Sequence, residues 1–390
     1  MPADTSRQVG QRVAATRQSR RMTQADLARA TSVSLAMIKA VERGARTPSD
    51  ATLDVIAGAL GVDPSRLVTG YACKERRVHA ALPELSAVLA AYDSPLGQSV
   101  RTAAELRRDV KQAEAWRLAA QYGRIAEHVP TLLADTLRRL HSSHTPDAAR
   151  LVFSTARTAD AVAYKYRAHD LSARLVDLMR WAAAQADDPM LSTTAAYVRT
   201  ETFFAAQAHE AGLRALEAAL DAAPSPHGDE GNAARGALHM RAAVIAGRAG
   251  DDSAAALHLA EAEQFGDRVR EDVYQGTAFG PDSVRIHAVS VAVGLGGDHV
   301  SRALEVAEDW KPPEDLPAER CSGFYIELAR AQLWSGLADD AFASLKAARR
   351  IAPQHTREHP WAKHDTATLR RLKRADAESL TRFAEWIGAV

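Results

Sequence analysis

The 390-residue sequence is poor in cysteine, in aromatic residues and in long apolar runs, and each shortage excludes a class of protein. Only Cys73 and Cys321 are present, too few for a disulfide framework or a cysteine-bound zinc site. No run approaches the roughly 18 apolar residues of a membrane-spanning helix, and the N-terminal MPADTSRQVGQR lacks the apolar core of a signal peptide. We therefore expect a cytoplasmic protein with reduced thiols and no membrane partner, although a bridge between the two cysteines stays open.

Aromatic residues make up 6% of the chain, whereas Ala, Leu, Arg and Glu, which favour helices, abound. Runs with the period of two typical of strands are hard to find. Because 390 residues exceed one ordinary core, we expect an all-α protein of two or three domains.

The formal net charge is zero, but the charged residues are unevenly distributed. Residues 1–80 carry 13 Lys and Arg against 7 Asp and Glu, a balance of +6, which leaves −6 on the remaining 310 residues. A basic head on an acidic body is typical of a DNA-binding module attached to a sensing or assembly domain. Chance clustering of surface arginine is the alternative, so the local pattern must decide.

Cap residues divide the first 70 residues into five short helices. The expected helices begin near residue 6, at Thr23, at Ser34, at Pro48-Ser49 and at Asp63-Pro64. Gly44 and Gly61 end the third and fourth helices. The apolar positions expected in the core are Val9, Val13, Leu27, Ala28, Val33, Ile38 and Val41. Five helices with short connections predict a compact helix-turn-helix domain.

The segment MTQADLARATSVSLAMIKAVERGARTPSDATLDVIAGALGVD resembles the Cro/λ-repressor-like (XRE) family of regulators. The matching positions include Thr23-Gln24, Leu27-Ala28, Val33-Ser34, Ile38, Glu42-Arg43-Gly44, Pro48-Ser49 and Leu60-Gly61-Val62. The resemblance covers only about residues 6–70. The sequence departs from the family at Arg21, where Gly is usual, and at Thr31-Ser32, where Leu-Gly is usual.

This resemblance implies roles for several residues. Gln24 would contact a phosphate and brace the third helix, since helix N-termini offer free N–H groups to anions. Arg12 and Glu42 resemble the structural ion pair of the family. Arg46 and Thr47 would hold the phosphate backbone.

One side of the third helix is free to read DNA bases. Leu35, Ala36, Lys39, Ala40 and Arg43 share that side, and small apolar groups there can pack on thymine methyls. Lys39 and Arg43 can donate to guanine or to phosphate. The alternative is that Leu35 and Ala36 pack against another helix. The full set of predicted DNA contacts is Thr23, Gln24, Ser34, Leu35, Ala36, Lys39, Ala40, Arg43, Arg46 and Thr47.

The rest of the chain is organised as a linker and a repeat region. Residues 71–99 form the linker, with one helix around Pro83–Ala91. From residue 100 to 390, helical patterns alternate with short breaks, and the two clearest units align on Gly250 and Gly336. About five degenerate units predict an α-solenoid of TPR-like helix pairs, capped by a long helix near 101–126, with an irregular bundle as the alternative.

This combination of an XRE head and a TPR-like body resembles RRNPP-like peptide sensors and, more closely, actinobacterial XRE–TPR regulators. The segments ALPELSAVLAAYDSP and TAFGPDSVRIHAVSVAV carry the second likeness. The resemblance implies a homodimer with a peptide or small-molecule effector on the inner face, which the first helix of each unit would line. The predicted effector residues are Arg157, Tyr164, Tyr197, Glu201, Phe204, His287 and Arg330, with ordinary inter-repeat packing as the alternative.

No catalytic or metal-binding motif stands in a supporting context. His355, His359 and His364 form the most metal-like cluster, and we interpret them as solvated surface histidines. We therefore expect no enzyme, no metal and no cofactor, but a dimeric regulator of double-stranded DNA with a near-palindromic operator. The alternative is a TPR scaffold or antitoxin-like partner binder whose DNA-binding head serves autoregulation.

Overall fold

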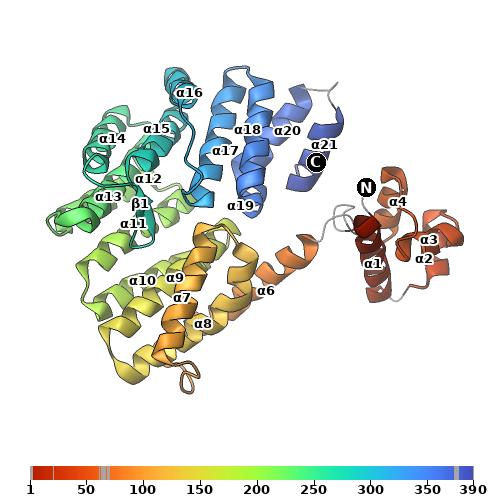
Figure 1. Cartoon of the computed structure of the whole chain (residues 1–390), viewed down its shortest axis with the longest axis horizontal. Coiled ribbons are helices and arrows are strands. Elements are labelled where there is room, and N and C mark those ends of the chain that lie inside the picture. Colours follow the sequence, from red (N-terminus) through yellow and green to blue (C-terminus); the bar gives the residue numbers. More distant parts are fainter. Residues whose placement is uncertain are drawn as a thin grey trace. The chain divides into compact units, whose positions relative to one another are not determined.

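The computed structural model of the chain describes residues 3–20, 22–60, 62, 67, 71–372 and 377–389. It divides into two compact units, Met1–His79 and Ala80–Val390. The boundary between the units falls within the stretch predicted as a linker, residues 71–99, and inside one helix, α6 (Tyr71–Ala90). Both units are helical, as expected (Figure 1).

The described helices of the first unit are α1 (Ala3–Ser19), α2 (Gln24–Thr31), α3 (Leu35–Glu42) and α4 (Asp50–Ala59). Side-chain caps begin three of them, because each cap oxygen accepts a backbone N–H that the first turn leaves without a partner. Thr23 caps α2 in a reciprocal capping box with Asp26. Ser34 caps α3 and Ser49 caps α4, as the sequence predicted.

The core of the first unit contains the predicted apolar residues. Val13, Leu27, Ile38 and Val41 are fully buried, while Ala28 and Val33 are partly buried against them. The fifth helix predicted after Asp63, and also Arg21 and Gly61, lie outside the described residues.

The turn between α2 and α3 keeps its shape without glycine. Ser32 adopts φ 54°, the left-handed conformation that costs a non-glycine residue roughly 1 kcal/mol. Thr31 is buried, and its hydroxyl donates to the Leu27 carbonyl (2.7 Å) and accepts from the Val33 N–H (3.3 Å). These bonds hold the turn that the family makes with Leu-Gly.

The ion pair predicted between Arg12 and Glu42 is wrong in one partner. Arg17 makes the pair, because Val9, Val13 and Arg17 follow one another at intervals of four residues along the buried face of α1. Arg12 instead donates from Nη1 to the Leu67 carbonyl at 3.2 Å.

Two predicted helix boundaries in the second unit are also wrong. Pro83 lies inside α6 rather than at its start, and its side chain is exposed. The single helix expected over 101–126 is two helices, α7 (Ala103–Leu118) and α8 (Tyr122–Ser143). The chain breaks at Ala120, which adopts φ 52°.

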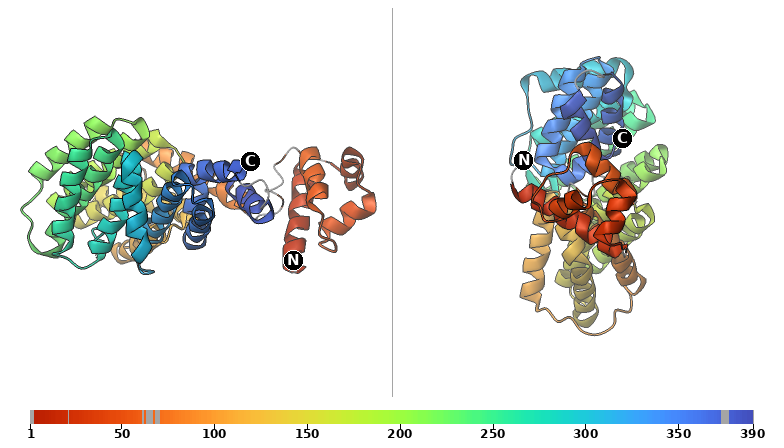
Figure 2. Two further views of the ribbon diagram at one scale, coloured as in Figure 1. Left: turned by 90° about the horizontal axis from the view of Figure 1, so that it is seen from above. Right: turned by 90° about the vertical axis from the view of Figure 1, so that its right-hand side faces the viewer.

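The second unit is an array of helix pairs, each packed on the next (Figures 1 and 2). After α7 and α8, its pairs are α9 (Pro146–Lys165) with α10 (His169–Ala186), α11 (Pro189–Ala206) with α12 (His209–Ala222), α13 (Gly228–Ala249) with α14 (Asp252–Gly266), α15 (Pro281–Leu295) with α16 (Val300–Asp309), and α17 (Ala318–Trp334) with α18 (Ala338–Ile351). A short 3-10 helix, η1 (Gly297–His299), precedes α16. The helices α19 (Pro353–Glu358), α20 (Pro360–Leu372) and α21 (Ala377–Ile387) complete the unit.

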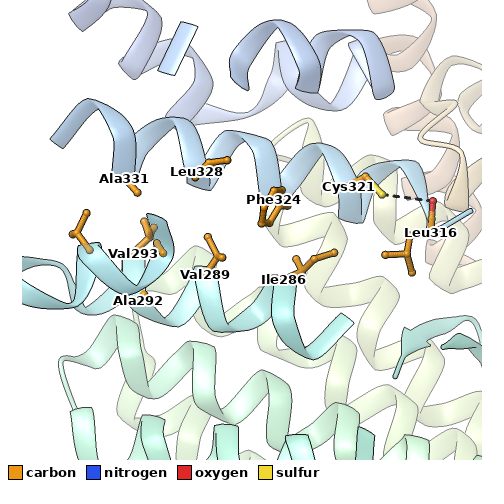
Figure 3. Packing of buried hydrophobic residues seen from close by; sticks show 11 residues of the cluster. Ile286, Val289, Ala292, Val293, Leu316, Cys321, Phe324, Leu328 and Ala331 are labelled. Carbon is orange, nitrogen blue, oxygen red and sulfur yellow. Dashed lines mark hydrogen bonds between the residues drawn. The ribbon is translucent and has the colours of Figure 1, made fainter. Parts of the chain in front are cut away.

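The glycines used to align the two clearest repeats occupy the same structural position. Gly250 and Gly336 have φ of 77° and 78° and each lies in the turn between the two helices of a pair. The left-handed conformation favours glycine, which explains why both repeats use it. Between successive pairs, apolar side chains of α15 and α17 interdigitate, with Phe324 buried among them (Figure 3). Cys321 in this core is a buried free thiol, and burial raises its pKa to about 11.

A β-hairpin that the sequence did not predict interrupts the helices before α15. Strands β1 (Asp272–Tyr274) and β2 (Thr277–Phe279) pair antiparallel, and Gln275 and Gly276 form the turn with positive φ. Phe279 is fully buried against Gly236, where a Cβ would lie 2.0 Å from the ring. Three-residue strands are too short to give a period-two signal.

The array curls so that its last helices meet its first. Tyr122 in α8 donates to Glu319 in α17 (2.7 Å), and the Gly123 N–H donates to the Gln354 side chain in α19 (3.0 Å). In the described part of the chain, no helix combines the length and apolar character that crossing a membrane requires.

Candidate functional site

The outer side of α3 is exposed as the sequence predicted. Leu35, Ala36, Lys39 and Arg43 are exposed and Ala40 is half-buried. With 38% of Leu35 accessible, no described helix of the first unit covers this side chain. The Lys39 side chain makes no hydrogen bond or ion pair within the described residues. Arg43 Nε donates to the Lys39 carbonyl (3.1 Å), which holds the guanidinium near the end of α3.

A buried hydrogen-bond network fixes α3 to the rest of the unit. Arg17 donates from Nε and Nη2 to the two carboxylate oxygens of Glu42 (2.7 and 2.9 Å). Gln24 Nε2 donates to the same carboxylate at 2.7 Å. Burial opposes the charge of Glu42, but these three donors hold its pKa below the ordinary value. Gln24 therefore braces α3, and its second amide hydrogen stays free for a phosphate.

The remaining predicted DNA contacts lie around the ends of α2 and α3. Arg46 and Thr47 are exposed in the loop after α3. The Thr23 and Ser34 side chains are also exposed, but their oxygens already cap the two helices.

The second unit encloses a cavity of about 540 Å³. Its walls come mainly from α9, α11, α13, α15 and α17, the first helices of successive pairs. The end of α7, the hairpin, α19 and the start of α20 complete them. Six of the seven predicted effector residues lie in these walls: Arg157, Tyr164, Tyr197, Glu201, Phe204 and His287. The seventh, Arg330, lies outside the walls and pairs with Asp365 at 3.4 Å.

The hairpin tip is held against the cavity by arginine side chains. Arg157 donates to the Gln275 carbonyl and to the Thr277 hydroxyl (2.6 Å), and Arg117 donates to the Gly276 carbonyl (2.9 Å). Burial and the neighbouring Arg117 lower the pKa of Arg157 to about 9.

Arg320 joins the hairpin to the wall beside it. It donates to the Ala278 carbonyl (3.3 Å), the Tyr197 hydroxyl (3.3 Å) and His287 Nε2 (2.6 Å). Burial tends to raise the pKa of Tyr197, but the charges of Arg241 and Arg320 outweigh it and lower that pKa to about 8.

Two carboxyl groups in the wall share a hydrogen bond. Burial and then the charge of Glu201 raise the pKa of Asp160 well above its ordinary value, while Ser172 donates to Asp160 at 2.6 Å. The bond to Asp160 favours the charged form of Glu201, so Asp160 is the donor of the pair.

Lys165 and Glu319 form a second charged group, 2.5 Å apart. Burial opposes the charge of Glu319, but Lys165 holds the pKa of that carboxylate well below its ordinary value. This pair ties α9 to α17 at the place where the array closes.

The interpretation of His355 and His359 as solvated surface residues is wrong. His355 is 3% exposed, and its two ring nitrogens lie 2.6 Å from the Ser322 hydroxyl and 3.4 Å from Lys165 Nζ. Burial, with Lys165 nearby, lowers the pKa of His355 to about 3 and also depresses that of His359, so both rings are neutral. His364 alone is exposed.

The cavity residues that sequence reasoning missed include Arg241, Arg248 and Trp361. Arg241 and Arg248 are seven residues apart on α13 and so share its inner face. The seven-residue interval was visible in the sequence, but only the register of the array shows that this face is the inner one. Among the described residues, no group of three or more His, Cys, Asp and Glu could hold a metal ion.

Comparison with known proteins bears on the first unit. Residues 13–67 match a family model described as helix-turn-helix. Residues 13–67 form a helix-turn-helix domain. Over 60 residues the chain is 42% identical to the immunity repressor protein of Bacillus phage phi105. That alignment covers 15% of this chain and 42% of the repressor, so the chain spans less than half of its relative.

Two solved structures are similar to the chain over a longer range. One is Bacillus thuringiensis PlcR in complex with the peptide PapR7 and DNA, at 14% identity over 67% of this chain and 95% of that one, with a TM-score of 0.26. The other is the apo form of the competence regulator ComR from Streptococcus vestibularis, at 14% identity over 96% and 99% of the two chains, with a TM-score of 0.27. TM-scores this low establish no common arrangement of the helix-turn-helix domain and the array.

Proposed function

We propose that the protein is a transcription regulator in which the helix-turn-helix domain binds double-stranded DNA. The observation that carries the proposal is the exposed outer side of α3, within a segment that matches a helix-turn-helix family. Lys39, which has no partner among the residues that the structure describes, would donate to a base edge or a phosphate. Leu35 and Ala36 would pack on thymine methyls. The excess of basic residues in 1–80 would attract the DNA backbone.

The array would supply control rather than chemistry. A cavity of about 540 Å³ is in the size range of ligand sites. It lies in the second unit, separate from the helix-turn-helix domain. An effector that binds one arrangement of the array better than another would shift the balance between them. Homodimers would place two recognition helices in successive major grooves, which predicts a near-palindromic operator. The proposed function needs no enzyme activity.

DNA selection tests this proposal. The purified full chain is used to enrich duplexes from a random library, and affinity for the selected duplex is measured by fluorescence anisotropy at fixed salt. Lys39→Ala should weaken binding by about 1–3 kcal/mol, roughly 5- to 150-fold. Lys111→Ala, which removes the same charge from an exposed site in the array, should change it little.

Three results would contradict the proposal. The library could yield no enriched duplex, the Lys39→Ala protein could bind as tightly as the parent, or affinity could fail to fall with added salt, as counterion release requires. A selected site without two-fold symmetry would remove the dimer from the proposal.

A further inference from the structure

We propose that the cavity takes a small organic anion, with its carboxylate or phosphate group on Arg248 and Arg241 and its apolar body against Phe204 and Trp361. This inference rests on the proposed function in one respect, which is that the cavity of the array binds an effector.

Arginine and aromatic side chains alternate along this wall, and the series ends at Arg330, which lies outside the cavity lining. The guanidinium carbons of Arg241 and Arg248 lie 5.7 and 4.4 Å from the centre of the Phe204 ring. Those of Arg248 and Arg330 lie 5.2 and 4.3 Å from the centre of the Trp361 ring. We call these five residues the guanidinium–aromatic ladder, and Arg248 is its middle cation.

Among the described residues, the middle cation is the one of the three arginines without a salt bridge, and the carboxyl of Glu327 influences its pKa only through space. Arg241 lies 3.9 Å from Glu201, and Arg330 lies 3.4 Å from Asp365. Within the described residues, Arg248 has neither a hydrogen bond nor an ion pair, although its side chain is half-buried. Two aromatic rings occupy faces of its guanidinium, which leaves the N–H edges for a planar or tetrahedral oxyanion.

Arg241 has spare donor capacity beside it. Its Nε is buried and has no hydrogen-bond partner, and an unpaired buried donor costs about 1–3 kcal/mol. Its salt-bridge partner, Glu201, is shared with Asp160. A ligand oxyanion would supply an acceptor for the remaining N–H groups of both arginines.

The other buried cations of the cavity are already engaged. Lys165 pairs with Glu319, and Arg117, Arg157 and Arg320 bind the hairpin backbone. Arg167 also lines the cavity but is exposed to solvent. The anion site therefore belongs on the ladder.

The overall charge of the cavity favours the same class of ligand. Its walls carry seven Lys or Arg side chains against five Asp or Glu. Burial raises the pKa values of Asp160, Glu201 and Glu327, which weakens their negative charge further. A neutral or cationic ligand would leave the excess positive charge uncompensated.

A small ligand fits these walls better than a peptide. An extended peptide presents an N–H and a carbonyl at every residue, and amide side chains can satisfy both. Among the lining residues that the structure describes, there is no Asn and one Gln, Gln207. The hairpin tip also lines the cavity, where Arg117 and Arg157 hold it and so leave less room for a peptide.

The test uses two anions and a neutral analogue with the same ring. Phenylacetate, phenyl phosphate and phenylacetamide are each added at 10 mM to the full chain, and unfolding is followed by tryptophan fluorescence. At least one anion should raise the melting temperature by about 2 °C or more, and the amide should not. The anion that raises it more identifies the oxyanion. Titration calorimetry then gives its dissociation constant.

Substitutions on the ladder locate the site. Arg248→Gln should weaken binding of the preferred anion at least about tenfold. Arg248→Lys keeps the charge and the bulk but loses the planar fork, so it should fold normally and still bind more weakly. Arg167→Gln removes one charge from the exposed edge of the same cavity and should leave the dissociation constant within about twofold.

Four results would overturn the inference. These are no stabilisation by either anion, equal stabilisation by the amide, unchanged affinity in both Arg248 variants, or equal losses in Arg248→Gln and Arg167→Gln. A free tetrapeptide, Ala-Ala-Leu-Phe, that binds more tightly than both anions would also overturn it, by assigning the cavity to peptides. Because none of these measurements uses DNA, they separate this inference from the proposed function.

Discussion

Removing Arg17 should unfold the first unit well before the second. In Arg17→Met, the Glu42 carboxylate would lose two of its three donors and keep only Gln24. The side chains of Arg17 and Glu42 are 10% and 5% exposed, so water cannot replace the lost donors. Breaking a buried pair by deleting one partner leaves an uncompensated charge.

The expected loss is large relative to the stability of such a unit. Deleting one partner of a buried pair costs about 3–5 kcal/mol. At 0.05–0.15 kcal/mol per residue, a unit the size of Met1–His79 has only about 4–12 kcal/mol in total. Since 1 kcal/mol shifts the melting temperature of a small domain by about 4–8 °C, the first unit should melt at least about 12 °C lower.

The tryptophans allow the two units to be followed separately. All six lie between Trp116 and Trp386, in the second unit, whereas circular dichroism at 222 nm reports helices in both. Arg17→Met should therefore lower the temperature of an early dichroism transition without moving the fluorescence transition.

Two controls bound the interpretation. Arg29→Met breaks an exposed pair with Asp26, whose side chains are 78% and 41% exposed, and should cost less than about 1 kcal/mol. Arg17→Met/Glu42→Leu removes both charges and should recover most of the loss. If Arg17→Met costs no more than Arg29→Met, the buried network does not stabilise the unit as argued.

The pH dependence of Arg17→Met should have the opposite sign to that of the parent. In the parent, the pKa of Glu42 lies below its unfolded value, so its stabilisation is present above the unfolded pKa and is lost as pH falls through the folded pKa. Without Arg17, burial dominates and raises that pKa. The variant should then regain stability as the pH falls from 7 toward 5, and a variant that instead loses stability over this range would contradict the argument.

Two further predictions concern single positions in each unit. Gly10→Ala should destabilise the first unit by several kcal/mol, because the new Cβ would lie 2.1 Å from the Val41 carbonyl oxygen. In α4, the Cβ added by Gly58→Ala meets nothing within 4 Å, so this variant should be more stable by about 0.5–1 kcal/mol. Equal melting temperatures of the two variants, measured by circular dichroism, would refute the close packing of α1 on α3. In the second unit, burial raises the pKa of Asp160, so the protonated carboxyl stabilises the folded state. This contribution to the free energy of unfolding is fully present below the ordinary pKa of aspartate. It is lost as the pH rises toward the pKa of Asp160 in the folded state, by up to about 1.4 kcal/mol per pH unit. Asp160→Asn keeps both hydrogen bonds without the proton, so its fluorescence-detected stability should decline less between pH 5 and 7, and parallel slopes would show that Asp160 is not the titrating group.

The sequence predicted those parts of the fold that depend on local rules. Cap residues such as Ser34 begin helices because they satisfy free N–H groups, and Gly250 and Gly336 mark turns because left-handed backbone favours glycine. Both signals lie within a few residues of the feature that they report. The helix pairs of the array could therefore be located without any knowledge of their packing.

The errors arose where tertiary packing selected between local alternatives. Arg12 and Arg17 are both arginines on α1, and only the direction in which that helix faces α3 decides which one meets Glu42. The break at Ala120 has no glycine to mark it. Histidines in HTREHPWAKH look solvated because their neighbours are polar, yet His355 is buried where the array closes on itself.

In the cavity, the repeat pattern predicted some residues, whereas the contacts made by the single β-hairpin could not be predicted. The repeat register predicted which faces point inward, and six predicted residues line the cavity. The hairpin is a single insertion outside that register, and it engages Arg117, Arg157 and Arg320 through backbone carbonyls. Which arginine remains without a salt bridge therefore depends on contacts between segments about 120 to 160 residues apart, and no periodic pattern encodes them.

Three histidines of this cavity, His287, His355 and His359, should add no positive charge to it at physiological pH, because burial disfavours their charged forms. The pKa of His355 is lowered to about 3 and those of His287 and His359 lie well below the ordinary value. Protonation of these three rings would therefore not control anion binding on the ladder. Occupancy would follow the concentration of the anion, as a concentration-sensing regulator requires.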